Sequence, residues 1–330
     1  MTDYSNKGSF FLRSKAILLA MAVCLATSAG ARSQELHTIQ VQGNVYMIVT
    51  PGGNIAVQVG KQGVAVVDSG RAEDSEKVLA EIGKLTDRKI RYIVNTSADA
   101  DRVGGNEKLA AAGISVVGGN EAGQLSGSAS SVANIVAHEN VMNRMSAPTG
   151  KESPTPPAAW PTDTYFVNEK NMFFNGEAIQ LIHIPNAHTD GDTLVFFRRS
   201  DVLVAGDIFT PGSYPVIDVL RKGGVQGVVA GLNELIHLSI PAEKQEGGTY
   251  VIPGRGRLCD QADVVEYRDM LTIIRDRVQD MIRKSMTLEQ VKAAKPTRDY
   301  DPLYGSTTGN WTNDMFLEAV YQSLSAPPKK

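Results

Sequence analysis

The chain has 330 residues, of which 42% are hydrophobic and 21% are charged, which is an ordinary composition for a globular protein. Its 33 basic and 36 acidic residues give a formal net charge of −3, so no basic excess indicates a nucleic-acid partner. After residue 31, no stretch has the roughly 18 consecutive apolar residues of a membrane-spanning helix, so none is expected in the mature chain.

The first 31 residues have the pattern of a secretory signal peptide. Lys7, Arg13 and Lys15 precede the apolar run AILLAMAVCLATSAGA, which ends in small residues at Ala31. We therefore expect residues 1–31 to be a signal peptide that is cleaved near Ala31, which would make the protein periplasmic or secreted. An N-terminal membrane anchor is the alternative, and the short apolar run argues against it.

The next part of the chain alternates predicted strands and helices. Short apolar runs and alternating apolar and polar residues predict strands, whereas apolar residues spaced by three and four predict helices. Strands are expected at residues 39–50, 54–60, 63–70, 89–96 and 114–119. Helices are expected at residues 72–86, 106–113 and 130–145.

A proline-rich break at residues 147–165 precedes a second series of elements. Strands are expected at residues 171–175, 177–185, 193–198, 201–207 and 249–254. Helices are expected at residues 224–239, 262–284, 287–294 and 313–324. The order indicates an α/β (α+β) protein in which two mixed sheets pack face to face with helices outside, rather than one doubly wound sheet.

Polar side chains follow five of the predicted buried strands, in the loops where functional sites tend to assemble. The five segments are VVDSG at Asp68, NTSADADRVGGN at residues 95–106, IPNAHTDGD at His188, VAGD at Asp207 and IPGRG at Arg255. Each of them carries an acid, a histidine or an arginine. We therefore expect them to meet in one site.

These five segments, in this order, resemble the metallo-β-lactamase superfamily from about residue 41 to residue 256. In that family a strand ends in aspartate, the next loop reads NTHxHxDHxGGN, and P-x-x-H-T-x-G-D, A-G-D and P-G-H-G follow. The resemblance implies the four-layer αββα sandwich of that family over residues 32–260. Residues 261–330 would then form a helical C-terminal extension packed on it.

The resemblance also assigns seven former metal positions, because members of the family usually bind two zinc ions. The first-metal positions are Ser97, Asp99 and His188, the second-metal positions are Asp101, Arg102 and Arg255, and Asp207 is the bridging position. Asp101, His188 and Asp207 retain the family's ligand types. The other four positions depart from them.

The two arginines decide what these departures mean. Zinc needs a lone pair from imidazole, thiolate or carboxylate, whereas a guanidinium has five donors and no lone pair. Loss of the second metal is therefore expected at Arg102 and Arg255, which should instead pair with the nearby carboxylates. No cofactor is expected. The alternative is one weakly bound divalent cation (zinc, manganese, magnesium or iron) at Asp99, His188 and Asp207.

Other residues have expected supporting roles. The family resemblance places Asp68 behind the site, although the residue is also a common turn former. Gly104 and Gly105 should let the loop turn tightly into the following helix. His138 is a candidate for the pocket rim. Candidates for the pocket walls are Trp160, Tyr214 and Trp311.

Three functions remain open from the sequence. The first is a non-hydrolytic or weakly active family member that binds an unknown small molecule or protein. The second is a hydrolase of an ester, lactam or thioester, with one atypical metal at Asp99, His188 and Asp207, or with Asp101 or His188 as a metal-free general base. The third is a periplasmic protein–protein interaction module.

Overall fold

The computed structural model describes residue 1 and residues 35–115, 132–147 and 154–325. Residues Leu36–Lys330 form one compact unit, so the predicted C-terminal extension belongs to the same unit as the sandwich. The predicted signal peptide at residues 1–31 lies outside the described residues, as do residues 116–119 of one predicted strand.

The first sheet has the strand order β1-β2-β3-β4-β5-β6-β7. Its strands are β1 (His37–Gln42), β2 (Val45–Thr50), β3 (Gly53–Gly60), β4 (Gly63–Val67), β5 (Ile90–Val94), β6 (Asn134–His138) and β7 (Asp163–Tyr165). The first four strands form antiparallel pairs, and the pairs from β4 to β7 are parallel. The carboxyl ends of β4 and β5 therefore lie at the same edge of this sheet.

The second sheet has the strand order β12-β11-β10-β9-β8. Its strands are β8 (Glu169–Phe174), β9 (Glu177–Ile184), β10 (Asp192–Phe197), β11 (Val202–Gly206) and β12 (Tyr250–Pro253). The pair β11–β12 is parallel, so these two strands also end at one edge, while the other pairs are antiparallel.

The helices lie before, between and after the strands. They are α2 (Ser75–Leu85), α3 (Ala100–Val103), α4 (Asn106–Ala112), α5 (Glu139–Ser146), α6 (Val225–Leu238), α7 (Gln261–Arg283), α8 (Leu288–Ala294), α9 (Asp301–Tyr304) and α10 (Asn313–Ser325). Asp260 caps α7 and Thr287 caps α8, each in a capping box. Among the described residues, none of these helices combines the length and the apolar character needed to cross a membrane.

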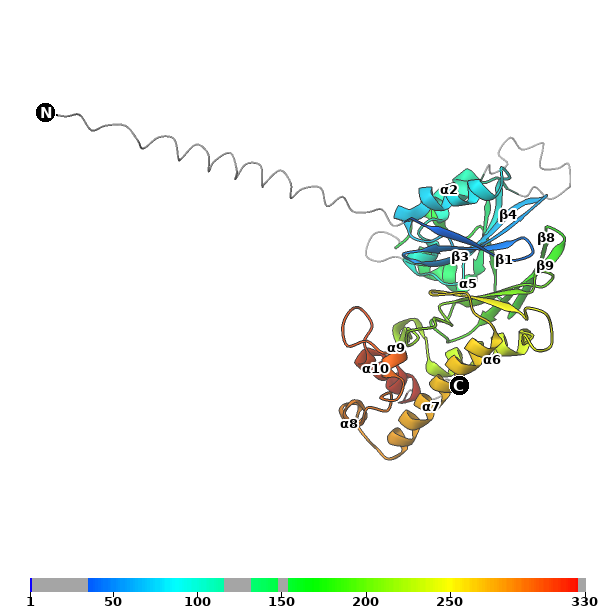
Figure 1. The fold of residues 1–330 in the computed structure, drawn as a ribbon. Helices are drawn as coiled ribbons and strands as arrows, with labels where there is room; N and C mark the ends of the chain where they lie inside the picture. The colour runs from blue at the N-terminus through cyan, green and yellow to red at the C-terminus, as the bar shows by residue number, and fades with distance from the viewer. Residues whose placement is uncertain (2–34, 116–131, 148–153, 326–330) are drawn as a thin grey trace. The chain divides into compact units, whose positions relative to one another are not determined.

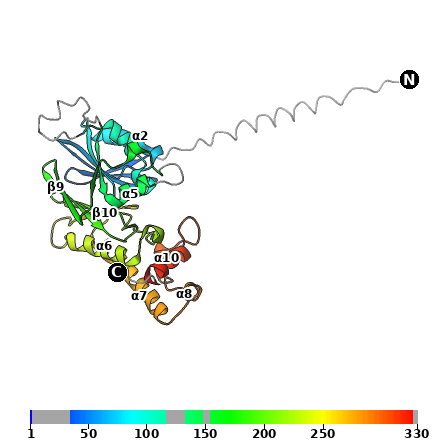
Figure 2. The ribbon, with the colours of Figure 1, turned by 180° about the vertical axis from the view of Figure 1, so that it is seen from behind.

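Three of the four apolar clusters among the described residues separate four layers. The first core lies between α2, α4 and the outer face of the seven-stranded sheet, and the second lies between the two sheets. The third packs the five-stranded sheet against α6, α7 and α10 (Figure 1). The reverse view shows the same order of layers, with α6 below β9 and β10 (Figure 2). The predicted αββα sandwich with a helical C-terminal part is confirmed.

In the segment expected to be one helix at residues 130–145, the described part from residue 132 contains a strand followed by a helix, so that prediction was wrong in its first half. Residues Ile135–His138 belong to β6, are buried, and pair with both β5 and β7. A strand buried on both faces lacks the alternation that reveals a half-buried strand. Strand β7, inside the proline-rich break, was also missed, and Ile114 and Ser115 are not in a strand.

The imidazole of His138 is buried at the corner between β6 and α5. Its ring stacks on His183 with centroids 3.6 Å apart, meets the edge of Tyr165, and its Nδ1 accepts a hydrogen bond from the Asn140 N–H. Burial and the nearby His183 lower the pKa of His138 to about 4, against an opposing effect of Asp190. The folded protein therefore holds this imidazole neutral well below its ordinary pKa.

Acid should consequently destabilise the fold between pH 6.5 and pH 4. In that window the unfolded chain binds a proton at His138 that the folded chain excludes, so the stability is complete above the window and is lost as pH falls. Between about pH 7 and about pH 4.5, the free energy of unfolding measured in urea should fall by about 2 kcal/mol more in the unmodified protein than in His138→Asn. The asparagine keeps a capping acceptor but does not titrate. An equal fall in the free energy of unfolding in both proteins would show that His138 does not cause the loss of stability in acid.

Candidate functional site

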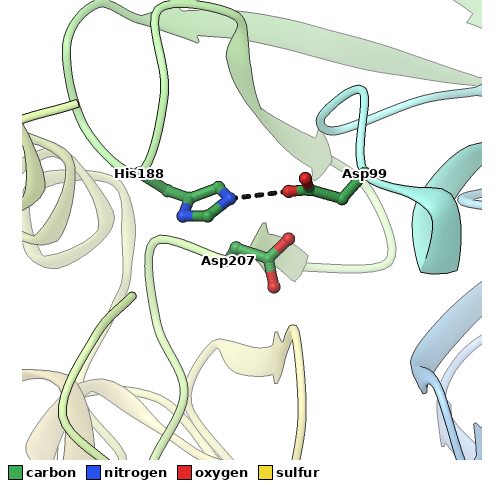
Figure 3. Close-up of side chains that lie close together, drawn as sticks. All are labelled: Asp99, His188 and Asp207. Carbon is green, nitrogen blue, oxygen red and sulfur yellow. Dashed lines mark hydrogen bonds and ion pairs between the residues drawn. The ribbon is translucent and has the colours of Figure 1, made fainter. Parts of the chain in front are cut away.

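The predicted site residues converge at one end of the sandwich, where strands of both sheets end. Asp99 lies in the loop after β5, His188 in the turn between β9 and β10, and Asp207 directly after β11 (Figure 3). One ligand atom from each of these three side chains lies within 4.8 Å of the others. Loops from two sheets thus build one cluster, although Asp99 and His188 lie 89 residues apart in the chain.

Arg102 occupies the floor of this cluster and binds Asp207 with two hydrogen bonds. Its Nε donates to Asp207 Oδ2 over 2.9 Å and its Nη2 donates to Oδ1 over 2.6 Å and to the Gly254 carbonyl over 3.1 Å. Burial disfavours the charged form of Asp207, but the Arg102 cation and its hydrogen bonds lower the pKa of this carboxyl. The guanidinium is fully buried, so the pair is a desolvated bidentate ion pair.

A glycine makes room for this guanidinium. A Cβ at Gly53 would lie 2.6 Å from Arg102 Nη1 and 2.5 Å from the Gly254 carbonyl, and the φ of Gly53 is +142°. Nη1 has no hydrogen-bond partner among the described residues and packs against this backbone. A side chain at residue 53 would therefore exclude Arg102 from its present position.

Asp68 lies behind Arg102, in the supporting place that the sequence suggested. Its carboxylate accepts hydrogen bonds from the Thr96 N–H and hydroxyl at 2.8 and 2.7 Å, and Oδ2 lies 3.9 Å from Arg102 Nε. Burial raises the pKa of Asp68 to about 7, and the Arg102 charge opposes that rise. Its backbone is left-handed, with φ of 63°, as expected for a turn-forming residue that leaves a strand.

Both ring nitrogens of His188 face acceptors. Nδ1 lies 2.8 Å from the Val216 carbonyl oxygen, and Nε2 lies 2.6 Å from Asp99 Oδ2. Burial alone would lower the pKa of His188, but the Asp99 hydrogen bond, with the charges of Asp192 and Asp207, raises it to about 10. His188 is therefore an imidazolium that donates two hydrogen bonds.

Asp99 has a second cationic partner that the sequence did not reveal. Arg221 Nη2 lies 2.6 Å from Asp99 Oδ1, and Arg221 Nε donates to Asp218 over 2.6 Å. Burial opposes ionisation of Asp99, but His188 and Arg221 outweigh it and hold the pKa of this carboxyl well below its usual range. Arg221 belongs to none of the five strand-end segments, and only its i,i+3 spacing from Asp218 hinted at a pairing role.

The remaining predicted residues lie around this centre. Ser97 is buried and its hydroxyl donates to Asp99 Oδ2 over 3.2 Å, while Arg255 pairs with Asp101 at the surface. A Cβ at Gly104 would lie 2.4 Å from the Ala100 carbonyl, and one at Gly105 would lie 2.3 Å from the Ser69 carbonyl. These two glycines form the turn that leads into α4, as the sequence suggested, and they also permit close packing of backbone segments.

A cleft of about 950 Å³ opens in front of these residues. Its lining includes the site residues Asp99, His188, Asp207 and Arg255. It also includes residues of the C-terminal part of the chain, among them Tyr304 and Trp311. Of the residues suggested for the pocket, Tyr214 and Trp311 line this cleft, and Trp160 and His138 are not among its described lining residues.

The donor set does not fit a pair of zinc ions. Arg102 and Arg255 stand at two positions that the family resemblance assigns to the second metal, and neither side chain has a lone pair to offer. Both oxygens of Asp207 are bound by Arg102. Within the described residues, Asp99, His188 and Asp207 form the one group close enough to hold a single cation. A cation there would have to displace the His188 proton and compete with two arginines.

Comparisons with known proteins agree with this fold. A family model described as the metallo-beta-lactamase superfamily matches residues 39–255. No curated protein sequence matches the chain. Among solved structures, the inverting sec-alkylsulfatase Pisa1 from Pseudomonas sp. superposes with a TM-score of 0.59 and 14% identity, over 87% of this chain and 50% of that one.

Two metallo-beta-lactamases superpose over a smaller part of this chain. The enzyme from Pontibacter korlensis has a TM-score of 0.51 and 16% identity, over 72% of this chain and 99% of that one. DIM-1 has a TM-score of 0.52 and 18% identity, over 72% and 98%. Identities this low show a shared fold and no more, and this chain spans about half the length of the alkylsulfatase.

Proposed function

We propose that this chain, which belongs to the metallo-beta-lactamase superfamily, is a metal-independent member that binds a small molecule in its cleft and has lost zinc-dependent hydrolysis. In the family, a metal-bound hydroxide attacks a carbonyl group. In this protein, arginine side chains supply positive charge where the family has metal ions. The pocket would then keep the family's shape while losing its source of hydroxide.

The observation that carries this proposal is the buried pair between Arg102 and Asp207. The guanidinium is 0% exposed and binds both oxygens of the carboxylate that would bridge two metal ions. A fixed cation in that place opposes a dication by Coulomb repulsion, which is strong where water is excluded. Arg255 is a second arginine at a position where the family has a metal-ligating histidine, and it pairs with Asp101 at the surface.

A second candidate is a hydrolase that uses one atypical cation at Asp99, His188 and Asp207. The observation that favours it is the convergence of their ligand atoms within 4.8 Å. The metal-free form of this hydrolase has less support. His188 donates from both ring nitrogens and so offers no lone pair to take a proton, and Asp101 is paired with Arg255.

We also propose that the protein is exported. The support is the order of residues 1–31, where three basic residues precede an apolar run and a small-residue ending. A secreted binding protein would meet its ligand outside the cytoplasm. Mass spectrometry of the mature N-terminus tests this directly, because cleavage near Ala31 is expected.

Purified protein should contain far less than about one zinc, manganese or iron per chain, because the cations of Arg102 and Arg255 take the place of metal. Elemental analysis of protein prepared without chelator is the measurement. Added zinc or manganese should leave the melting temperature unchanged, whereas a cation that binds the folded state would raise it. One tightly held metal ion per chain, together with hydrolysis of an ester, lactam or thioester that Asp207→Ala abolishes, would favour the second candidate.

A further inference from the structure

We propose that the cleft binds an anionic small molecule, whose carboxylate or sulfate group is held between Arg71 and Arg255 and whose uncharged part lies against Tyr304 and Trp311. This inference rests on the proposed function, because a cation bound in the cleft would itself attract an anion. All four residues line the same cleft of about 950 Å³. The hydrogen bonds and ion pairs of Asp207 and Asp99 described above involve none of these four residues.

The carboxylates on the cleft floor are already neutralised. Arg102 binds both oxygens of Asp207, and His188 and Arg221 bind the two oxygens of Asp99. A cationic ligand would therefore have to break an internal ion pair, and buried pairs of this kind are costly to break. The floor presents no free carboxylate that would favour a cation over an anion.

The arginines at the mouth retain unused donors. Arg71 is 42% exposed, and its Nη2 donates one long hydrogen bond of 3.4 Å to the Pro51 carbonyl. Its nearest carboxylate, on Glu73, is 4.0 Å away and itself 70% exposed, so this surface pair is weak. Arg255 is 46% exposed and pairs with Asp101 through one nitrogen, Nη2. Its other N–H groups have no hydrogen-bond partner among the described residues. A planar guanidinium with free N–H groups is well suited to carboxylate and sulfate oxygens.

Asp101 brings the two arginines to one place. A Cβ at Gly52 would lie 2.9 Å from Arg71 Cγ and 3.3 Å from Asp101 Cβ, so both side chains lie over this glycine. Asp101 in turn contacts Arg255. The Arg71 side chain therefore lies beside Asp101 over Gly52, and Arg255 pairs with the same aspartate, so an anion between the two arginines would pair with both.

The C-terminal residues of the cleft lining suit an uncharged group. Tyr304 and Trp311 provide aromatic surface, and the neighbouring lining residues carry hydroxyl or amide groups, namely Ser306, Asn310, Thr312 and Asn313. None of these side chains is charged. The two arginines and these C-terminal residues together indicate a ligand with an acidic group at one end and an apolar or neutral polar body at the other.

Trp311 gives a direct measurement, because the chain has two tryptophans and Trp160 lies outside the cleft lining. In a Trp160→Phe background, fluorescence of Trp311 should change saturably with phenylacetate and with hexyl sulfate. Phenylacetamide and phenethylammonium, which have a similar body without the negative charge, should bind at least about tenfold more weakly. Heptanoate carries an alkyl body like that of hexyl sulfate on a carboxylate, so a preference between these two anions distinguishes a carboxylate from a sulfate ligand.

Matched variants locate the anion. Arg71→Gln and Arg255→Gln should each raise the dissociation constant about tenfold, the loss expected for one charge-assisted contact. Arg257→Gln is the control and should bind as the parent does, because Arg257 pairs with Asp263 and does not line the cleft. Gly52→Ala should weaken binding without removing charge, because the added Cβ would displace the Arg71 side chain.

Several results would overturn the inference. They are no saturable signal from either anion in folded protein, equal binding of the amide, or full binding in both Arg71→Gln and Arg255→Gln. Failure of anion binding in protein that contains no metal would leave the proposed function standing. Conversely, metal-containing protein that binds anions through the two arginines would overturn the proposed function and leave the anion site.

Discussion

Replacing Arg102 by methionine should destabilise the protein by about 3–5 kcal/mol, the cost of removing one partner from a buried ion pair. The guanidinium is 0% exposed, and it neutralises Asp207 directly and Asp68 from 3.9 Å. Without it, the buried carboxylate of Asp207 would lose its bidentate partner, and the pKa of Asp68, already about 7, would rise further and favour its neutral form. Urea unfolding at neutral pH measures the loss.

Two further variants distinguish the cost of an unpaired buried charge from the cost of losing an arginine side chain. Arg102→Met combined with Asp207→Asn removes both charges, so it should lose clearly less stability than Arg102→Met alone. Arg255→Gln removes an exposed partner of Asp101 and should cost less than about 1 kcal/mol. A small loss in Arg102→Met, similar to that of Arg255→Gln, would show that the buried pair does not hold the site together.

Restoring histidine at Ser97, Asp99, Arg102 and Arg255 together should convert the protein into a zinc binder. The four substitutions complete the family's seven ligand positions with His188, Asp101 and Asp207, and they remove the guanidinium groups of Arg102 and Arg255 from the metal positions. We expect about two zinc ions per chain after dialysis, and a higher melting temperature in zinc, because binding to the folded state alone stabilises it. Elemental analysis and thermal unfolding with and without zinc measure both effects.

The matched control keeps Arg102 and restores histidine at the other three positions only. Because Arg102 binds both oxygens of Asp207, this variant should hold no more than about one zinc ion per chain. Circular dichroism confirms that each variant is folded before metal is added. A folded four-histidine variant that binds no zinc would show that the family's ligand positions were assigned to the wrong residues of these loops.

The pairing inside the site could be anticipated only in part. The acids and arginines after the buried strands predicted an Arg–Asp network, and Arg102 does bind Asp207. The sequence did not indicate which carboxylate each arginine would choose. It also missed Arg221, which reaches Asp99 from a short 3₁₀ helix (η4, Val219–Arg221) that has no distinctive sequence pattern.

The sequence by itself determined the layers and the polar residues at the strand ends. Apolar periodicity and turn residues act within a few positions of the chain, so they identify strands, helices and the loops between them. Only the tertiary structure decided that residues 134–138 form a strand, because a strand buried on both faces and a helix segment can share one apolar pattern. It also decided the pairing of Arg102 with Asp207, 105 residues away, and the aromatic wall that Tyr304 and Trp311 form. Such contacts depend on how distant segments pack, which no local pattern encodes.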